Sequence, residues 1–197
     1  MIAVVGVELL PEALGGAAPA WLIVAGLVFG GLFYVLLDVI IDRASGGEEE
    51  AGAWVIYAAI AIDLFSDGLM IGVGSVVSLG LALVLAIGQV TADIPEGFAT
   101  IANFKDKGVP RARRLILSAS FVIATLAGAS IGYWLLRNQS ETFKLTALAF
   151  TAGILLLAAV EEMIQEAHEA AEDTRLSAGF FIGGFALFTL VASYFEG

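Results

Sequence analysis

Four acidic residues lie within two otherwise apolar stretches of the chain. Asp63 and Asp67 belong to AIDLFSDGLMIG, and Asp93 and Glu96 belong to TADIPEGFATI. Residues three or four positions apart project from one face of a helix, so each pair shares a face. Carboxylates gathered in an apolar setting repel one another unless they are protonated or neutralised by a cation. A bound divalent ion would neutralise them, and oxygen ligands suit Mg²⁺, Mn²⁺, Fe²⁺ or Zn²⁺.

Pro95 and Gly97 flank Glu96 and predict a helix kink at this level. Proline lacks a backbone donor and frees a carbonyl one turn earlier, while glycine removes side-chain bulk beside the acids. Interrupted helices in the middle of a membrane mark ion pathways in transporters. The other interpretation is a kinked packing helix with protonated acids. It gives no energetic reason to bury four carboxyl groups, each of which costs about 2.5–3.5 kcal/mol at mid-membrane.

The composition predicts that a membrane surrounds these residues. Of 197 residues, 59% are hydrophobic and 15% charged, and the mean hydropathy is +0.94. Soluble domains carry about 25% charged residues, so an ordinary cytosolic protein is excluded. The net charge of -11 argues against a nucleic-acid partner. The absence of cysteine excludes disulfides, thiolate metal ligands and thiol nucleophiles.

Long apolar runs predict an all-α, polytopic transmembrane helix bundle. Residues 1–14 are apolar and helical in type but too short to cross a membrane alone, and they lack the features of a signal peptide. We interpret them as the last half of a further helix. The chain 1–197 is expected to form a single transmembrane domain. The six full spans are predicted at 20–42, 52–77, 79–104, 112–136, 143–170 and 177–195.

The basic residues predict the orientation of these spans. Lys and Arg near helix ends stay on the cytoplasmic side, and alternating the spans places seven of them on one side and two on the other. We therefore expect a multi-pass protein of the cell membrane with an extracytoplasmic C-terminus. The cytoplasmic group is Arg43, Lys105, Lys107, Arg111, Arg113, Arg114 and Arg175; the opposite group is Arg137 and Lys144.

The two acidic motifs resemble those of the ZIP (Zrt/Irt-like) divalent-metal transporters of bacterial or archaeal type. That family carries His-Asn-x-Pro-Glu-Gly on one central helix and Asn/Asp-x-Pro-Glu-Gly on the next. The second motif stands here as Asp93-Ile94-Pro95-Glu96-Gly97. The first stands as Asp63-Leu64-Phe65-Ser66-Asp67-Gly68, with Asp63 in place of the histidine and Asp67 in place of the glutamate. The resemblance covers nearly the whole chain and implies helices two to eight of an eight-helix fold, and a homodimer.

The chain departs from the family pattern at three positions that hold a second metal in related proteins. Leu64 replaces an asparagine, Ala92 a glutamine, and Thr125 a glutamate of the following helix. The resemblance therefore implies one metal position, formed by Asp63, Asp67, Asp93 and Glu96. Because this set contains only oxygen ligands, we expect a weaker preference for Zn²⁺ than a histidine-containing site shows.

Further acidic residues lie near helix ends. The resemblance implies that Glu161 and Glu162 help the metal to leave toward the cytoplasm. From Glu169 onward the acidic run is interpreted as a solvated helix end, and His168, the only histidine, as a surface residue. Glu8 and Glu12 could gather ions at the outer mouth, although Glu12 follows Pro11 and is equally consistent with a solvated position.

Glycine pairs at a spacing of four recur along the chain and predict close helix packing. They are Gly26 with Gly30, Gly68 with Gly72, Gly128 with Gly132, and Gly179 with Gly183.

The predicted function is transport of divalent metal ions of the Zn, Fe and Mn class toward the cytoplasm, with the metal as substrate. We expect no enzymatic activity and no organic cofactor; the partners are metal ions and membrane lipid. Binding requires ionised carboxylates and should weaken below about pH 5. Two alternatives stay open: a non-transporting ZIP-like metal sensor or partner subunit, and an intramembrane aspartyl hydrolase, which would need only two of the four acids.

Overall fold

The computed structural model describes residues 1–45, 53–163 and 174–195, and all regular structure in these ranges is helical. The all-α prediction is confirmed. A π-helical turn, η1 (Val4–Leu9), leads into α1 (Leu10–Gly15). The long helices are α2 (Ala20–Ser45), α3 (Ala53–Val77), α4 (Leu79–Asp106), α5 (Arg111–Leu136) and α6 (Glu141–Ala158), which ends in a second π-helical turn, η2 (Ala159–Met163); α8 (Thr174–Phe195) follows.

Five of the helices, α2 to α6, are long and apolar enough to cross a membrane. They coincide with the first five predicted spans, although residues 164–170 of the fifth lie outside the described ranges. The sixth predicted span is also helical, but the apolar part of α8 is shorter, from Ala178 to Tyr194. At 1.5 Å per residue this part covers about 26 Å, less than the ~30 Å hydrocarbon core.

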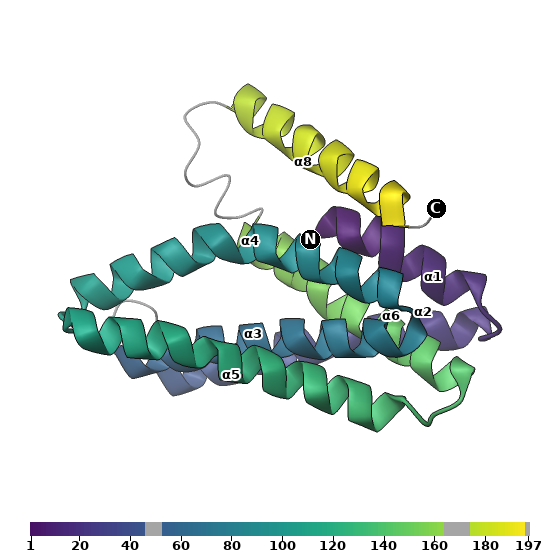
Figure 1. Ribbon diagram of the computed structural model, residues 1–197, viewed down its shortest axis with the longest axis horizontal. Helices are drawn as coiled ribbons and strands as arrows, with labels where there is room; N and C mark the ends of the chain where they lie inside the picture. Colours follow the sequence, from purple (N-terminus) through teal and green to yellow (C-terminus); the bar gives the residue numbers. More distant parts are fainter. Residues whose placement is uncertain (46–52, 164–173, 196–197) are drawn as a thin grey trace.

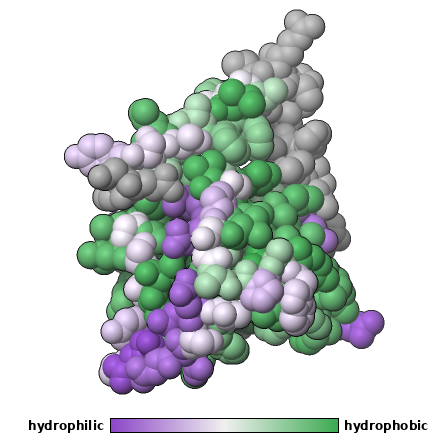
Figure 2. All heavy atoms as spheres, turned by 90° about the vertical axis from the view of Figure 1, so that its right-hand side faces the viewer, coloured by the Kyte–Doolittle hydropathy of each residue, from purple (hydrophilic) through white to green (hydrophobic). Residues whose placement is uncertain are grey.

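Consecutive long helices run in opposite directions (Figure 1). The α4–α5 loop and the end of α2 lie at one end of the molecule, and the α1–α2, α3–α4 and α5–α6 connections lie at the other. Arg43 and the basic residues of the α4–α5 loop therefore share one end, as the alternation of spans predicted. Figure 2, seen from the opposite end, shows a mostly hydrophobic surface with hydrophilic residues gathered in a band from its centre to its lower edge.

Two helix pairs, α3 with α5 and α2 with α6, approach each other through glycine. A side chain at Gly68 would clash with the carbonyl oxygen of Thr125, and one at Gly128 with that of Phe65. Gly30 and Gly153 play the same part between α2 and α6. Backbone can approach backbone this closely only where no Cβ intervenes. Three of the four predicted glycine pairs therefore lie at helix contacts.

The prediction for the fourth pair is wrong within the described chain. A Cβ added to Gly179 or Gly183 would meet nothing within 4 Å. The helix α8 contacts α4 and η1 instead, and it buries Ala192 completely while Phe188 packs against the main core. The two glycines therefore lie on a part of α8 that faces away from the bundle.

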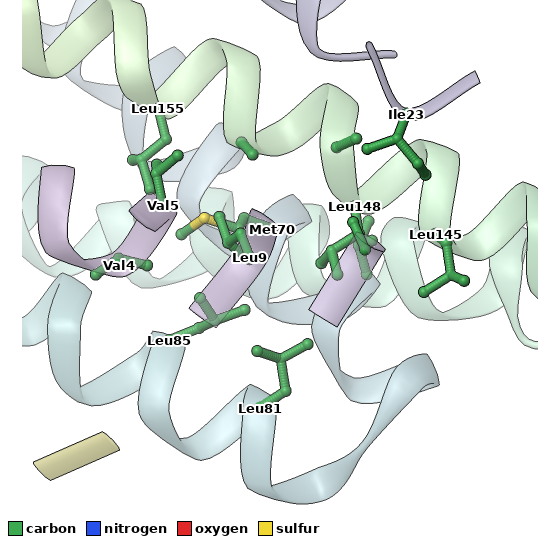
Figure 3. Packing of buried hydrophobic residues seen from close by; sticks show 14 of the residues in the cluster. Val4, Val5, Leu9, Ile23, Met70, Leu81, Leu85, Leu145, Leu148 and Leu155 are labelled. Atoms are coloured by element: carbon green, nitrogen blue, oxygen red, sulfur yellow. The ribbon is translucent and has the colours of Figure 1, made fainter. Parts of the chain in front are cut away.

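The short N-terminal segment lies at the centre of the main hydrophobic core. Val4, Val5 and Leu9 are at most 1% exposed. Figure 3 shows Leu9 beside Met70 of α3 and Val5 beside Leu155 of α6, with Leu81 and Leu85 of α4 nearby. The segment thus joins α3, α4 and α6, although it is too short to be a membrane span.

Candidate metal site

The centre of the acidic region is a hydrogen-bonded pair between α3 and α4. The two helices are antiparallel and joined at Ser78, whose side chain accepts a hydrogen bond from the backbone N–H of Leu81 at 3.0 Å. Asp67 and Gln89 are equally far from Ser78 in sequence and meet across the helices, with Gln89 Nε2 donating to Asp67 Oδ1. Only 4% of Asp67 and 2% of Gln89 is exposed. The pair is therefore sealed inside the bundle.

Each member of this pair keeps one oxygen unused. Asp67 Oδ2 and Gln89 Oε1 are both buried and have no hydrogen-bond partner among the described residues. An unsatisfied buried polar group costs about 1–3 kcal/mol, and more when it is charged. A cation would offer a partner to an oxygen of this kind, because carboxylate and amide oxygens are ligands of hard divalent ions.

Asp93 and Glu96 lie further along α4 and face a cavity of about 380 Å³. Glu96 is positioned in a turn where Thr100 Oγ1 donates to the Glu96 carbonyl at 2.8 Å. A side chain at Gly97 would meet nothing within 4 Å, so the space beside this part of α4 is open. The remaining lining residues come from α3, α4 and α5: Ile60, Leu64, Ile94, Gly97, Phe98, Thr100, Ile101, Ser118 and Phe121.

The helix α4 continues through Pro95. It bends along its length but is not interrupted (Figure 1). The predicted kink residues Pro95 and Gly97 thus lie within one continuous helix, beside the cavity rather than at a break in the backbone.

The four predicted carboxylates occupy one region. Asp63, Asp93 and Glu96 all lie close enough to act electrostatically on Asp67. Asp63 and Asp93 are, like Asp67 and Gln89, equally far in sequence from Ser78. Within the described residues, however, no three His, Cys, Asp or Glu side chains are close enough to hold one metal ion. The structure brings the four acids into one region without arranging them as a coordination shell.

A comparison with protein-family models decides the family. The model of the ZIP zinc transporter matches residues 41–192, most of the chain and both acidic motifs. The chain belongs to the ZIP zinc transporter family. Comparisons with curated proteins and with solved structures gave no match. The ZIP family consists of transporters rather than enzymes, and membership indicates a multi-pass membrane protein that transports divalent metal ions.

The positions at which this ZIP protein departs from the family motif supply no carboxylate or amide oxygen. Leu64 lines the cavity with an apolar side chain, and Ala92 has no polar side-chain atom. Thr125 Oγ1 donates to the Phe121 carbonyl of its own helix at 3.3 Å. The structure is thus in keeping with the loss of a second metal position, which stays a prediction.

The remaining predicted residues are placed as follows. Glu161 lies in η2, at the end of α6, and is partly buried. The side chain of Glu162, and all of Glu169 and His168, lie outside the described part of the structure. Glu12 is exposed, as a solvated position requires.

The expectation for Glu8 is wrong. Only 5% of Glu8 is exposed, so it lies inside the bundle and not at an outer mouth. The reason is that η1, instead of ending at the membrane surface, packs against α4, α6 and α8.

Sequence reasoning missed Gln89, the direct partner of Asp67. A signal was present, because Gln89 lies four positions before Asp93 and therefore on the same face of α4. The surrounding run LALVLAIGQV has no other polar side chain, so an amide there required a buried partner.

Proposed function

We propose that this ZIP protein carries divalent metal ions through the region of Asp63, Asp67, Asp93 and Glu96, toward the end that holds the α4–α5 loop. The buried, unpartnered Oδ2 of Asp67 supports this proposal most directly. A buried carboxylate oxygen contributes nothing to packing, whereas it can serve as a ligand of a cation that passes through. The ion draws the neighbouring acids together when it binds, because each gains more from coordination than it loses by mutual repulsion.

The donor atoms support a broad preference among divalent ions. The described residues around Asp67 offer carboxylate oxygens and the amide oxygen of Gln89, and neither α3 nor α4 contains His or Cys. Such a set suits Mn²⁺ and Fe²⁺ as well as Zn²⁺, while soft or nitrogen-rich sites favour Zn²⁺ more strongly. Competition among these ions during uptake should therefore show little advantage for Zn²⁺.

The charge of the two ends supports an orientation in which transport runs toward the cytoplasm. The α4–α5 loop and the helix ends beside it carry Lys105, Lys107, Arg111, Arg113 and Arg114, and such clusters stay cytoplasmic. The cavity at Asp93 and Glu96 continues along α4 to Thr100 and Ile101, toward this loop. Metal released past Glu96 would thus enter the cytoplasm, with Glu161 on the exit path. The same orientation places the C-terminus outside the cell, and a homodimer remains the family-based expectation.

Uptake of metal into proteoliposomes tests the proposal. Asp67→Ala and Glu96→Ala should each lower uptake by more than the roughly 10- to 100-fold that loss of a supporting residue costs at metal sites. Glu12→Ala, at an exposed position, is the control and should transport like the parent protein. Parent-like uptake by both site variants would refute the assignment of the site.

A non-transporting metal-binding relative is the second candidate, because Leu64, Ala92 and Thr125 offer no carboxylate or amide oxygen to a second ion. Equilibrium binding and uptake measured on the same preparation separate the two functions. The transporter binds and moves the ion, whereas a sensor or partner subunit binds it without uptake. The hydrolase alternative conflicts with family membership.

A further inference from the structure

A second cavity lies away from the acids, between the first turn of α3 and the α4–α5 loop. Its volume is about 240 Å³. Two basic side chains, Lys107 and Arg113, line it together with Trp54. The other lining residues are Ala53, Gly108, Val109, Pro110 and Leu117.

The α4–α5 loop folds back on itself to form this cavity. Gly108 has a φ of 75°, a left-handed conformation that glycine adopts without strain. The backbone N–H of Gly108 donates to Lys105 O at 3.0 Å, and that of Val109 to Phe104 O at 2.9 Å. Phe104 is fully buried and anchors the turn. The ordered loop therefore holds Lys107 next to Arg113 of the first turn of α5.

Three sources of positive potential meet at the cavity. Lys107 and Arg113 contribute full charges, and the Arg113 guanidinium lies 4.9 Å from the centre of the Trp54 ring, which ties α5 to α3. The third source is the beginning of α5, where Pro110 is the N-cap and provides no side-chain hydrogen bond. The first N–H groups of such a helix and its dipole favour an anion. This concentration of positive charge contrasts with the chain's net charge of -11.

The location indicates the kind of anion. Trp54 is 61% exposed and begins a membrane-spanning helix, which is where tryptophan marks the level of lipid headgroups. Basic pockets between transmembrane helices at the cytoplasmic side bind anionic headgroups. A phosphate group is small enough for the cavity, while the acyl chains would extend along the apolar outer surfaces of α3 and α5.

We propose that the cavity of Lys107, Arg113 and Trp54 binds the phosphate of an anionic phospholipid. The site is separate from the metal region, since none of its lining residues also lines the cavity of Asp93 and Glu96. The bound lipid would link the start of α3 to the start of α5 at the end of the molecule that contains the α4–α5 loop.

The chain supplies a matched control at the other end of α5. The Arg137 guanidinium lies 3.7 Å from the centre of the Trp134 ring. This second Arg–Trp pair is formed within one chain segment, and it lies at the C-terminal end of α5, where the helix dipole is negative. Arg137→Gln therefore removes a charge and a cation–π contact without changing the proposed lipid site.

Native mass spectrometry of the full chain tests the proposal, with protein released from nanodiscs of mixed phosphatidylglycerol and phosphatidylcholine. The parent protein should retain phosphatidylglycerol in preference to phosphatidylcholine. Lys107→Gln and Arg113→Gln should each weaken retention about fivefold, the usual effect of one basic residue on anionic lipid binding. Arg137→Gln should retain lipid like the parent, and size-exclusion profiles confirm that each variant is folded.

Three results would overturn the proposal. Equal loss of phosphatidylglycerol in Arg137→Gln would mean that general surface charge, and not the cavity, holds the lipid. Equal retention of phosphatidylcholine would mean that the headgroup charge is irrelevant. Displacement of the lipid by millimolar inorganic phosphate would identify a free anion as the ligand. None of these results bears on metal uptake, so the two proposals are tested separately.

Discussion

The acidic region has two levels that differ in access. Asp67 and Gln89 are sealed between α3 and α4, with at most 4% of either residue exposed. Asp93 and Glu96, further along α4, face a cavity of about 380 Å³. The same two helices thus present one closed level and one open level.

Local packing explains the difference. Beside Asp67, Gly68 lets α5 approach until backbone meets backbone, and the core formed by Leu9, Met70 and Leu85 covers the side toward the α3–α4 junction (Figure 3). Beside Glu96, Gly97 leaves space that no neighbouring residue fills. Transporters of the alternating-access type open a site to one side at a time. Under the proposed function, the structure represents an arrangement in which the level of Asp93 and Glu96 is accessible and the level of Asp67 is closed.

The largest expected effect is a difference in chemical access between the two levels. Because the chain contains no cysteine, single-cysteine variants report on one position each. A hydrophilic thiol reagent should label Ile101→Cys, which lines the cavity, to completion. Over the same period Gln89→Cys should remain unlabelled, because its thiol is buried. Labelling is measured by the shift in intact mass. Equal labelling of the two variants would show that both levels are open and would refute the difference in access.

A methyl group at Gly68 should open the closed level. Gly68→Ala forces a Cβ against the Thr125 carbonyl oxygen, and such overpacking costs about 1–3 kcal/mol. We expect a lower melting temperature in detergent and, in a Gly68→Ala, Gln89→Cys double variant, the appearance of thiol labelling.

Gly179→Ala is the matched control, because a Cβ there meets nothing within 4 Å. It adds the same methyl group to a helix. The melting temperature should stay unchanged or rise slightly, because the higher helix propensity of alanine adds up to ~1 kcal/mol to the free energy of unfolding. If Gly68→Ala behaved like this control, the close approach of α3 and α5 would not be what seals Asp67.

Much of the fold was predictable because long apolar runs leave few alternatives. The junction of α3 and α4 followed from the charge-free run of residues 68–92, which the predicted spans divide at Ser78. The position of residues 1–14 was not predictable in the same way. Hydropathy gives the length of a helix but not its neighbours, so it did not reveal that Leu9 fills the centre of the core. For the same reason the spacing of Gly179 and Gly183 predicted a close helix contact that the structure does not show.

The acids of the candidate site were visible in the sequence because charge is rare in a membrane helix. Their division into two levels was not. Spacing alone places Asp63 with Asp67 and Asp93 with Glu96, but pairing across the antiparallel helices joins Asp67 with Gln89. A search for charged ligands overlooks a neutral amide, although an amide buried in hydrocarbon also needs a partner.

The amide of Gln89 provides the subtlest test of the closed level. In Gln89→Leu, Asp67 Oδ1 loses its donor, and an unsatisfied buried acceptor costs about 1–3 kcal/mol. The melting temperature in the absence of metal should fall, and added Mn²⁺ should restore part of it, since a cation replaces the lost donor. Gln89→Glu keeps the shape but adds a fifth negative charge, so it should be less stable than the parent without metal and gain more from Mn²⁺. If both variants responded to Mn²⁺ like the parent, Gln89 would only fill space beside Asp67, and the cation would bind at the open level of Asp93 and Glu96 alone.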